Sequence, residues 1–211
     1  MGDYYTTRYA ENVGRSKVWK AIVEYLSKYW KLELPKIVDV GCGYGDFINH
    51  VQGGRLVAVD LNPDAEQYVK EGVEFFCSSA TDLSFIESAS MDLLFTSNLL
   101  EHLTDSDLDS AICEFKRVLK AGGVVITMQP NYYYAYREYF DDYTHKKVFS
   151  HESLVDWFMA NGFSLVSIEK RFLPFSLKSR LPKSYWLTKL YLLSFYRPFA
   201  KQMLGVFRNV S

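Results

Sequence analysis

The chain has 211 residues, 48% hydrophobic and 23% charged, a composition that excludes an intrinsically disordered chain and suits one domain. Three cysteines without a CxxC pair exclude a disulfide framework and a cysteine-based zinc site. The net charge of −1 hides nine basic and no acidic residues in 170–211, against 15 basic and 25 acidic residues before them. This split predicts that the tail meets an anionic group and that the acidic body does not bind nucleic acid.

Helical and strand patterns alternate along the chain. Apolar residues at helical spacing predict a helix over 15–30. β-branched or apolar runs predict buried strands at 36–40 and 56–60 and further strands at 73–77, 91–96 and 124–128. Between these strands we expect helices from Asp46 to about His50, from Pro63 onward, and from Thr104 to the Gly122-Gly123 pair. A loop at 130–149, a helix capped by Ser150 and ending at Asn161-Gly162, and strands at 163–170 and 202–208 complete the chain. This alternation predicts an α/β fold, a parallel sheet with helices on both faces.

Ligands of such sheets bind at the carboxyl ends of the strands, and a glycine-rich turn, Gly41-Cys42-Gly43-Tyr44-Gly45, follows the first strand. Its spacing differs from the GxGxxG of dinucleotide sites, because Asp46 occupies the place of the third glycine and would repel a pyrophosphate. A ligand with a cationic sulfonium and no phosphate tolerates that carboxylate better.

Two more acids follow the next two strands. Asp60 can accept hydrogen bonds from both hydroxyls of a ribose, or it caps the helix at Pro63. Asp82 can accept from the amine of an adenine, with the N–H of Leu83 serving a ring nitrogen, or it caps a helix. The ordered set of glycine turn and two acids favours a nucleoside ligand.

The segments VDVGCGYGDF, VAVDLN, SSATDL, MDLLFTSNLLEHL and FKRVLKAGGVVITMQPN, in this order, resemble the class I S-adenosylmethionine-dependent methyltransferases over residues 36–131. The resemblance implies a Rossmann-like, doubly wound sheet of about seven strands, mostly parallel, with the last strand antiparallel between strands five and six. It implies S-adenosylmethionine as the cofactor, with the methionine part at Asp39, Gly41 and Gly43, the ribose at Asp60 and the adenine at Asp82. The remaining predicted cofactor-binding residues are Leu61, Thr81, Leu83 and Asn98, the last beside the methionine amine and the acceptor.

Two groups of residues are candidates for catalysis. His102 is placed to remove a proton from a hydroxyl acceptor, or it merely orients its loop. The run Asp141-Asp142-Tyr143-Thr144-His145 could bind sugar hydroxyls, place a metal, or hold the acceptor and take its proton. We take His102, His145 and Asp141 as the catalytic candidates and predict no metal site.

The function that these features favour is O-methylation of a sugar or glycan, such as a surface polysaccharide or its lipid-linked precursor. The alternatives are methylation of a small lipophilic phenol or quinone, and a non-catalytic S-adenosylmethionine-binding docking protein. We expect one domain, 1–211, comprising an N-terminal helical cap (1–35), a donor-binding core (36–131), an acceptor loop (132–149) and a helical insertion (171–201) between the last two strands.

The insertion has two interpretations. Its apolar stretch at 185–200 is shorter than the ~20 residues of a bilayer span and is interrupted by charges, so we expect no membrane crossing. It either packs on the domain or a second subunit as a lid or dimer contact, or rests on an anionic membrane surface through aromatic and basic residues. The first residues lack the pattern of a signal peptide, so we expect a cytoplasmic protein, at most peripheral to the inner face of the membrane.

Overall fold

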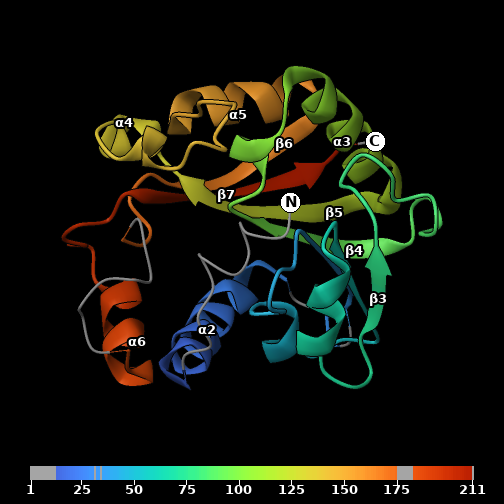
Figure 1. Ribbon diagram of the computed structural model, residues 1–211, viewed down its shortest axis with the longest axis horizontal. Helices are drawn as coiled ribbons and strands as arrows, with labels where there is room; N and C mark the ends of the chain where they lie inside the picture. Colours follow the sequence, from blue (N-terminus) through green and yellow to red (C-terminus); the bar gives the residue numbers. More distant parts are fainter. Residues whose placement is uncertain (1–12, 31, 34, 175–182, 211) are drawn as a thin grey trace.

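Seven strands form one mixed sheet with the order β3-β2-β1-β4-β5-β7-β6 (Figure 1). The computed structural model describes residues 13–30, 32–33, 35–174 and 183–210; parts of the predicted cap and insertion therefore lie outside the described residues. The strands are β1 (Lys36–Val40), β2 (Arg55–Asp60), β3 (Glu74–Cys77), β4 (Met91–Ser97), β5 (Leu119–Pro130), β6 (Phe163–Glu169) and β7 (Gln202–Asn209). Only β7 runs antiparallel to its neighbours β5 and β6, which confirms the predicted fold and the place of the last strand.

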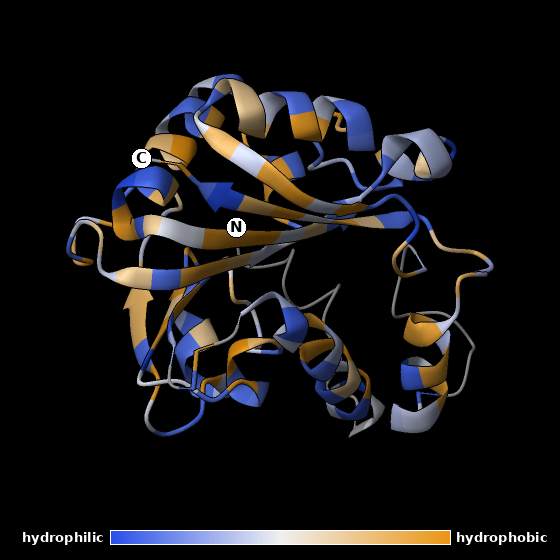
Figure 2. Ribbon diagram, turned by 180° about the vertical axis from the view of Figure 1, so that it is seen from behind, coloured by the Kyte–Doolittle hydropathy of each residue, from blue (hydrophilic) through white to orange (hydrophobic). Residues whose placement is uncertain are grey.

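Helices cover both faces of this sheet (Figure 1). One face carries α3 (Asp105–Val118) and α5 (His151–Ala160), and the other carries α2 (Val13–Leu26) and α6 (Tyr185–Leu193). Hydrophobic residues concentrate along the central strands, while the helices alternate between hydrophobic and hydrophilic residues (Figure 2). Aromatic rings join both helical layers to the sheet: Phe158 of α5 stacks on Phe207 of β7 at a centroid distance of 4.0 Å, and Trp19 of α2 lies edge-on to Phe95 of β4 at 6.2 Å. Buried hydrophobic residues thus form two cores.

Two helix starts follow their sequence signals. The Thr104 hydroxyl accepts from the Asp107 N–H, and the Asp107 carboxylate accepts from the Thr104 N–H, which confirms the predicted capping box of α3. Ser150 caps α5 in the same way, with Ser153 as its partner.

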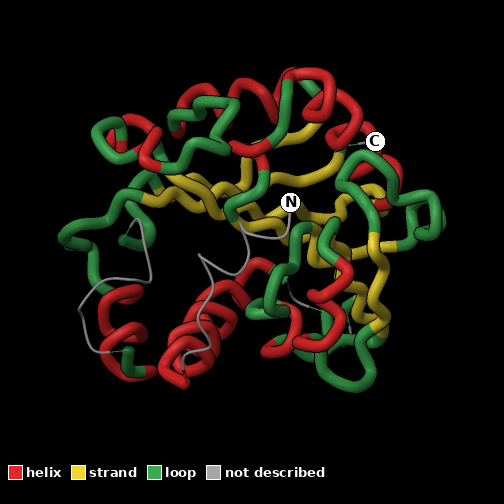
Figure 3. The backbone as a smooth tube through the Cα atoms, in the orientation of Figure 1, coloured by secondary structure: helices red, strands yellow, loops and turns green. Residues whose placement is uncertain are grey.

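Several connections between the strands differ from the predicted elements (Figure 3). The predicted helix at 46–50 is a single 3₁₀ turn, η2 (Ile48–His50), and the helix at Pro63 is the 3₁₀ segment η3 (Pro63–Tyr68). The predicted loop at 130–149 contains α4 (Tyr132–Ala135) and η5 (Tyr139–Asp141). Two further 3₁₀ turns are η1 (Ser27–Tyr29), after α2, and η4 (Leu100–His102), after β4.

The Gly122-Gly123 pair does not end α3, contrary to the prediction. The helix ends at Val118, and Leu119 already pairs with Met91 of β4. The register between β4 and β5 then shifts, and Gly122 has a φ of +76°, which only glycine adopts without strain. The glycines therefore serve an irregular stretch of β5.

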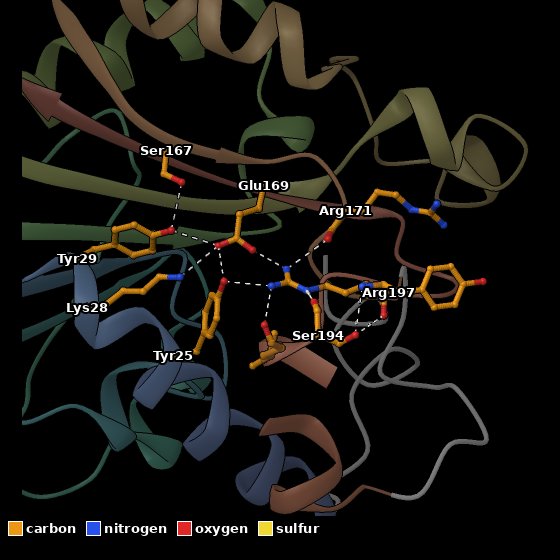
Figure 4. A network of polar contacts seen from close by, with 10 residues as sticks. Tyr25, Lys28, Tyr29, Ser167, Glu169, Arg171, Ser194 and Arg197 are labelled. Carbon is orange, nitrogen blue, oxygen red and sulfur yellow. Dashed lines mark hydrogen bonds and ion pairs between the residues drawn. The ribbon is translucent and has the colours of Figure 1, made fainter. Parts of the chain in front are cut away.

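The insertion lies between β6 and β7, as predicted, and a polar network fixes it to the domain (Figure 4). Arg197 donates to Glu169 of β6 at 2.5 Å and to the Tyr25 hydroxyl of α2 at 3.0 Å, and Tyr25 donates to Glu169 at 2.7 Å. Burial raises the pKa of Glu169, but the hydrogen bonds from Tyr25 and Arg197 outweigh it and hold this pKa below its usual value. None of the helices in the described part of the chain is long and apolar enough to span a bilayer.

Candidate active site

The glycine turn after β1 brings the backbone to the carboxyl end of the sheet. Gly41 and Gly43 have φ values of +74° and +51°, in the left-handed region that favours glycine. A Cβ on Gly43 would meet no atom within 4 Å, whereas one on Gly41 would lie 3.2 Å from the Leu99 side chain. The turn thus presents bare backbone to open space at Gly43 and touches the segment after β4 at Gly41.

Asp60, at the end of β2, is tied to that turn. Its carboxylate accepts from the N–H of Gly43 at 2.8 Å and from the N–H of Asn62 at 2.9 Å, and only 7% of the residue is exposed. The alternative role as the cap of η3 is wrong, because the Asn62 side chain caps it by accepting from the Asp64 N–H. A carboxylate has about four acceptor positions, so Asp60 retains acceptor capacity for ribose hydroxyls beside Leu61.

Asp39 and Asp46 lie around the same turn. Asp39 is only 2% exposed; burial raises its pKa well above the usual value, and the charges of Asp46 and Asp60 act in the same direction. Asp46 accepts from the Nε of Arg15 in α2 at 2.6 Å. This ion pair offsets the negative charge of Asp46, which was expected to repel a pyrophosphate. The glycine spacing still disfavours a dinucleotide.

The predicted adenine side differs from expectation at Leu83. Its N–H donates to a carboxylate oxygen of Glu114 in α3 at 2.7 Å, so it is not available to a purine nitrogen, and the prediction for Leu83 is wrong. Arg117 holds both groups, donating to Glu114 and to the Leu83 carbonyl at 2.8 Å. Asp82 is exposed and caps a local turn by accepting from the Ser84 N–H at 3.1 Å. Thr81 bonds through its N–H and hydroxyl to the Ser79 hydroxyl.

Asn98 marks the end of β4. It is an exposed residue with a φ of +50°, a conformation that non-glycine residues adopt at some energetic cost and often at functional sites. Its N–H donates to the Met128 carbonyl at 2.8 Å, and its side-chain oxygen accepts from Gln202 of β7 at 3.0 Å. No sequence signal indicated Gln202, because the contact depends on how β7 inserts beside β5.

His102, in η4, contacts the loop before α5. Its Nδ1 lies 2.9 Å from the Thr144 hydroxyl, and that hydroxyl donates to Asp142 at 2.6 Å. A hydroxyl has one proton, so His102 Nδ1 is the donor and the lone pair lies on Nε2. Burial and the neighbouring His145 lower the pKa of His102 to about 4, which keeps the ring neutral at physiological pH.

His145, which the sequence named as a separate candidate, lies beside His102 with ring centroids 4.9 Å apart. Its Nδ1 is 2.5 Å from the Tyr139 carbonyl, an acceptor, so His145 also carries its lone pair on Nε2. Asp141 is exposed, and the carboxylate connected to His102, through the Thr144 hydroxyl, is that of the buried Asp142. Glu101, which the sequence did not single out, is buried beside them, and burial raises its pKa to about 8.

Residues 38–127 match the family described as a methyltransferase domain. The protein MJ0638 of Methanocaldococcus jannaschii is 26% identical over 200 residues, which cover 94% of this chain and 84% of that protein. The ubiquinone/menaquinone biosynthesis C-methyltransferase UbiE of Campylobacter jejuni is 32% identical over 130 residues, 55% of this chain and 54% of the enzyme. The crystal structure of a SAM-dependent methyltransferase from Archaeoglobus fulgidus is similar with a TM-score of 0.69 at 20% identity, covering 92% of this chain and 94% of that one.

The sheet order, the antiparallel seventh strand and the helices on both faces are those of the Rossmann-like methyltransferase fold. The matched methyltransferase domain and the structural neighbour described as a SAM-dependent methyltransferase imply S-adenosylmethionine as the cofactor. The matched domain and the fold together support an S-adenosylmethionine-dependent methyltransferase.

Proposed function

We propose that this protein transfers the methyl group of S-adenosylmethionine to a hydroxyl oxygen of a sugar or glycan, with His102 as the base. The hydrogen-bonded chain from His102 through Thr144 to Asp142 carries this proposal. His102 follows Leu99 by three residues, and the Leu99 side chain approaches Gly41 of the glycine turn. A proton acceptor is thus built next to the turn that receives the donor.

In the proposed donor site, Gly41, Gly43 and Asn98 face the methionine part and Asp60 binds the ribose. The sulfonium already activates the methyl carbon, so the protein has to align the acceptor oxygen with it and remove the acceptor proton. Neutral His102 takes that proton on Nε2, and Asp142, through Thr144, stabilises the imidazolium that forms. Because a pKa of about 4 makes His102 a weak base, its contribution should lie toward the lower end of the usual 10²–10⁴-fold range.

The loop before α5 supports a sugar acceptor. Asp141 and Tyr143 are exposed there, and Tyr133 and Tyr136 of the same segment also expose their rings. Carboxylates accept hydrogen bonds from sugar hydroxyls, and aromatic faces provide apolar surface for a sugar ring.

A second candidate acceptor is a lipophilic phenol or quinol. The weak basicity of His102 favours it, because a phenol has a pKa near 10 and gives up its proton more readily than an alkyl alcohol. The similarity to UbiE, a C-methyltransferase named for ubiquinone and menaquinone biosynthesis, points to the same class. Exposed apolar residues on α6 and the segment after it would suit a membrane-borne acceptor: Trp186, Leu190, Leu193, Phe195 and Phe199.

One experiment separates these candidates and the non-catalytic alternative. The purified protein is incubated with methyl-labelled S-adenosylmethionine and, in parallel, with a glycan fraction and a lipid-quinone fraction, and products are identified by mass spectrometry. Label in a glycan hydroxyl supports the first candidate, and label in a phenol or quinone ring supports the second. Tight donor binding without donor turnover in either fraction would favour a non-catalytic binding protein.

A further inference from the structure

Glu101 has a buried carboxylate that forms no hydrogen bond with the described residues. The residue is 1% exposed, and neither carboxylate oxygen has a hydrogen-bond partner among the described residues. Burying a carboxylate without a partner is costly, so such groups are normally paired or coordinate a metal. The backbone holds the residue firmly, because its carbonyl accepts from the N–H groups of Lys146 and Lys147 at 2.8 and 3.0 Å.

The same carboxylate points toward two imidazoles. One ligand atom each from Glu101, His102 and His145 lie within 4.8 Å of one another. Both histidines carry their lone pairs on Nε2, since Nδ1 of His102 donates to Thr144 and Nδ1 of His145 lies on the Tyr139 carbonyl. Metal-binding histidines characteristically donate their other ring N–H to such a group, which fixes the tautomer and the ring orientation.

We propose that Glu101, His102 and His145 bind a divalent first-row transition-metal cation. Two imidazoles and one carboxylate suit zinc, manganese or iron and leave positions open for an exogenous ligand. Metal–ligand distances of about 2.0–2.2 Å keep neighbouring ligand atoms closer together than 4.8 Å, so binding would draw the three side chains toward one cation. The cation would also offset the mutual repulsion of Glu101 and the nearby Asp142.

This site departs from the sequence prediction of no metal. A loaded cation would occupy Nε2 of His102, which the proposed function uses as the base, and it would lower the pKa of an acceptor hydroxyl that it contacts. That consequence rests on the proposed function, whereas cation binding by the three residues does not. The two can therefore fail separately.

The test measures cation binding without substrate. Full-length protein with Cys77→Ser and Cys113→Ser, which removes two exposed thiols, is treated with chelator and titrated with Zn²⁺, Co²⁺ and Ca²⁺ by calorimetry. Glu101→Gln and His145→Ala are compared with His50→Gln, a matched histidine outside the cluster. We expect one Zn²⁺ per chain, at least tenfold tighter than Ca²⁺, weakened at least tenfold by Glu101→Gln or His145→Ala and unchanged by His50→Gln.

Visible absorption of Co²⁺ provides a second readout, because nitrogen ligation in a protein site changes the Co²⁺ spectrum and needs no enzymatic activity. A melting temperature for each variant shows that it remains folded. Equal binding of Zn²⁺ and Ca²⁺, or Zn²⁺ binding that survives both substitutions, would overturn the proposal. Metal binding without methyl transfer would leave the site standing and reject the proposed function, and methyl transfer by a protein that binds no cation would do the reverse.

Discussion

Replacing Asp60 by asparagine should weaken S-adenosylmethionine binding by about 10- to 150-fold. Asp60 accepts from the N–H groups of Gly43 and Asn62 and keeps two acceptor positions for the ribose. Losing hydrogen bonds to a charged group costs about 1.5–3 kcal/mol, and about 1.4 kcal/mol corresponds to a factor of ten in affinity.

The same substitution should also lower stability. An asparagine has one acceptor oxygen and one NH₂ group, so its NH₂ must face the N–H of either Gly43 or Asn62. One buried donor is then left without an acceptor, at a cost of about 1–3 kcal/mol. For a chain of this size each kcal/mol lowers the melting temperature by about 2–4 °C.

Calorimetric titration with S-adenosylmethionine, well below the melting temperature of the variant, separates the two effects. Asp64→Asn is the matched control, because it removes an exposed charge four residues along the chain without touching the turn. Affinity within threefold of the wild-type value in Asp60→Asn, with a folded protein, would refute the ribose assignment. A nicotinamide dinucleotide that binds while S-adenosylmethionine does not would refute the donor site as a whole.

At saturating donor, His102→Gln should lower methyl transfer by about 100-fold or more, while the donor dissociation constant stays within about threefold; unchanged turnover would exclude the base. The lowered pKa of Glu169 means that its stabilising contribution is present above the unfolded value of 4.5 and is lost as pH falls through its folded pKa. Urea denaturation at pH 3–7 should show this loss in the wild type and a flatter profile in Glu169→Gln, and parallel profiles would contradict it. Trp186→Ser with Phe195→Ser should abolish flotation with anionic vesicles, whereas wild-type protein that never floats would exclude a membrane contact.

The strands were predictable because each is a β-branched or apolar run bounded by turn residues, although β3 and β6 at the two edges of the sheet are only partly buried. The short connections were not predictable in detail. Pro63 indicated a helix start, but whether a turn continues as α or 3₁₀ depends on the space between neighbouring strands. The Gly122-Gly123 pair was assigned to a helix end because the pairing of the flanking Leu119 and Val124 with β4 is a tertiary contact that local sequence does not encode.

The positions of the glycine turn and of Asp60, where we propose that the donor binds, were predictable because both follow strand ends. Leu83 failed because Glu114, 31 residues away, takes its N–H. The sequence did not indicate a role for Glu101, since an acid beside a histidine is usually a solvated surface pair, and its burial depends on the fold. The sequence named His102 and His145 as separate catalytic candidates and did not predict their contact.

The charge split was the weakest basis for a functional inference. It suggested an external anion, yet three cations of the tail pair with acids of the body: Lys189 with Glu24, Arg197 with Glu169, and Lys201 with Glu138. Changing Arg197 to glutamate would therefore place two carboxylates in one half-buried network and release the insertion from the domain, whatever its partner. The described part of the insertion exposes large apolar side chains, with Trp186 73% exposed and Phe195 fully so. A contact made by such groups should be insensitive to salt, unlike one made by cations, and salt dependence therefore discriminates between the two modes of docking.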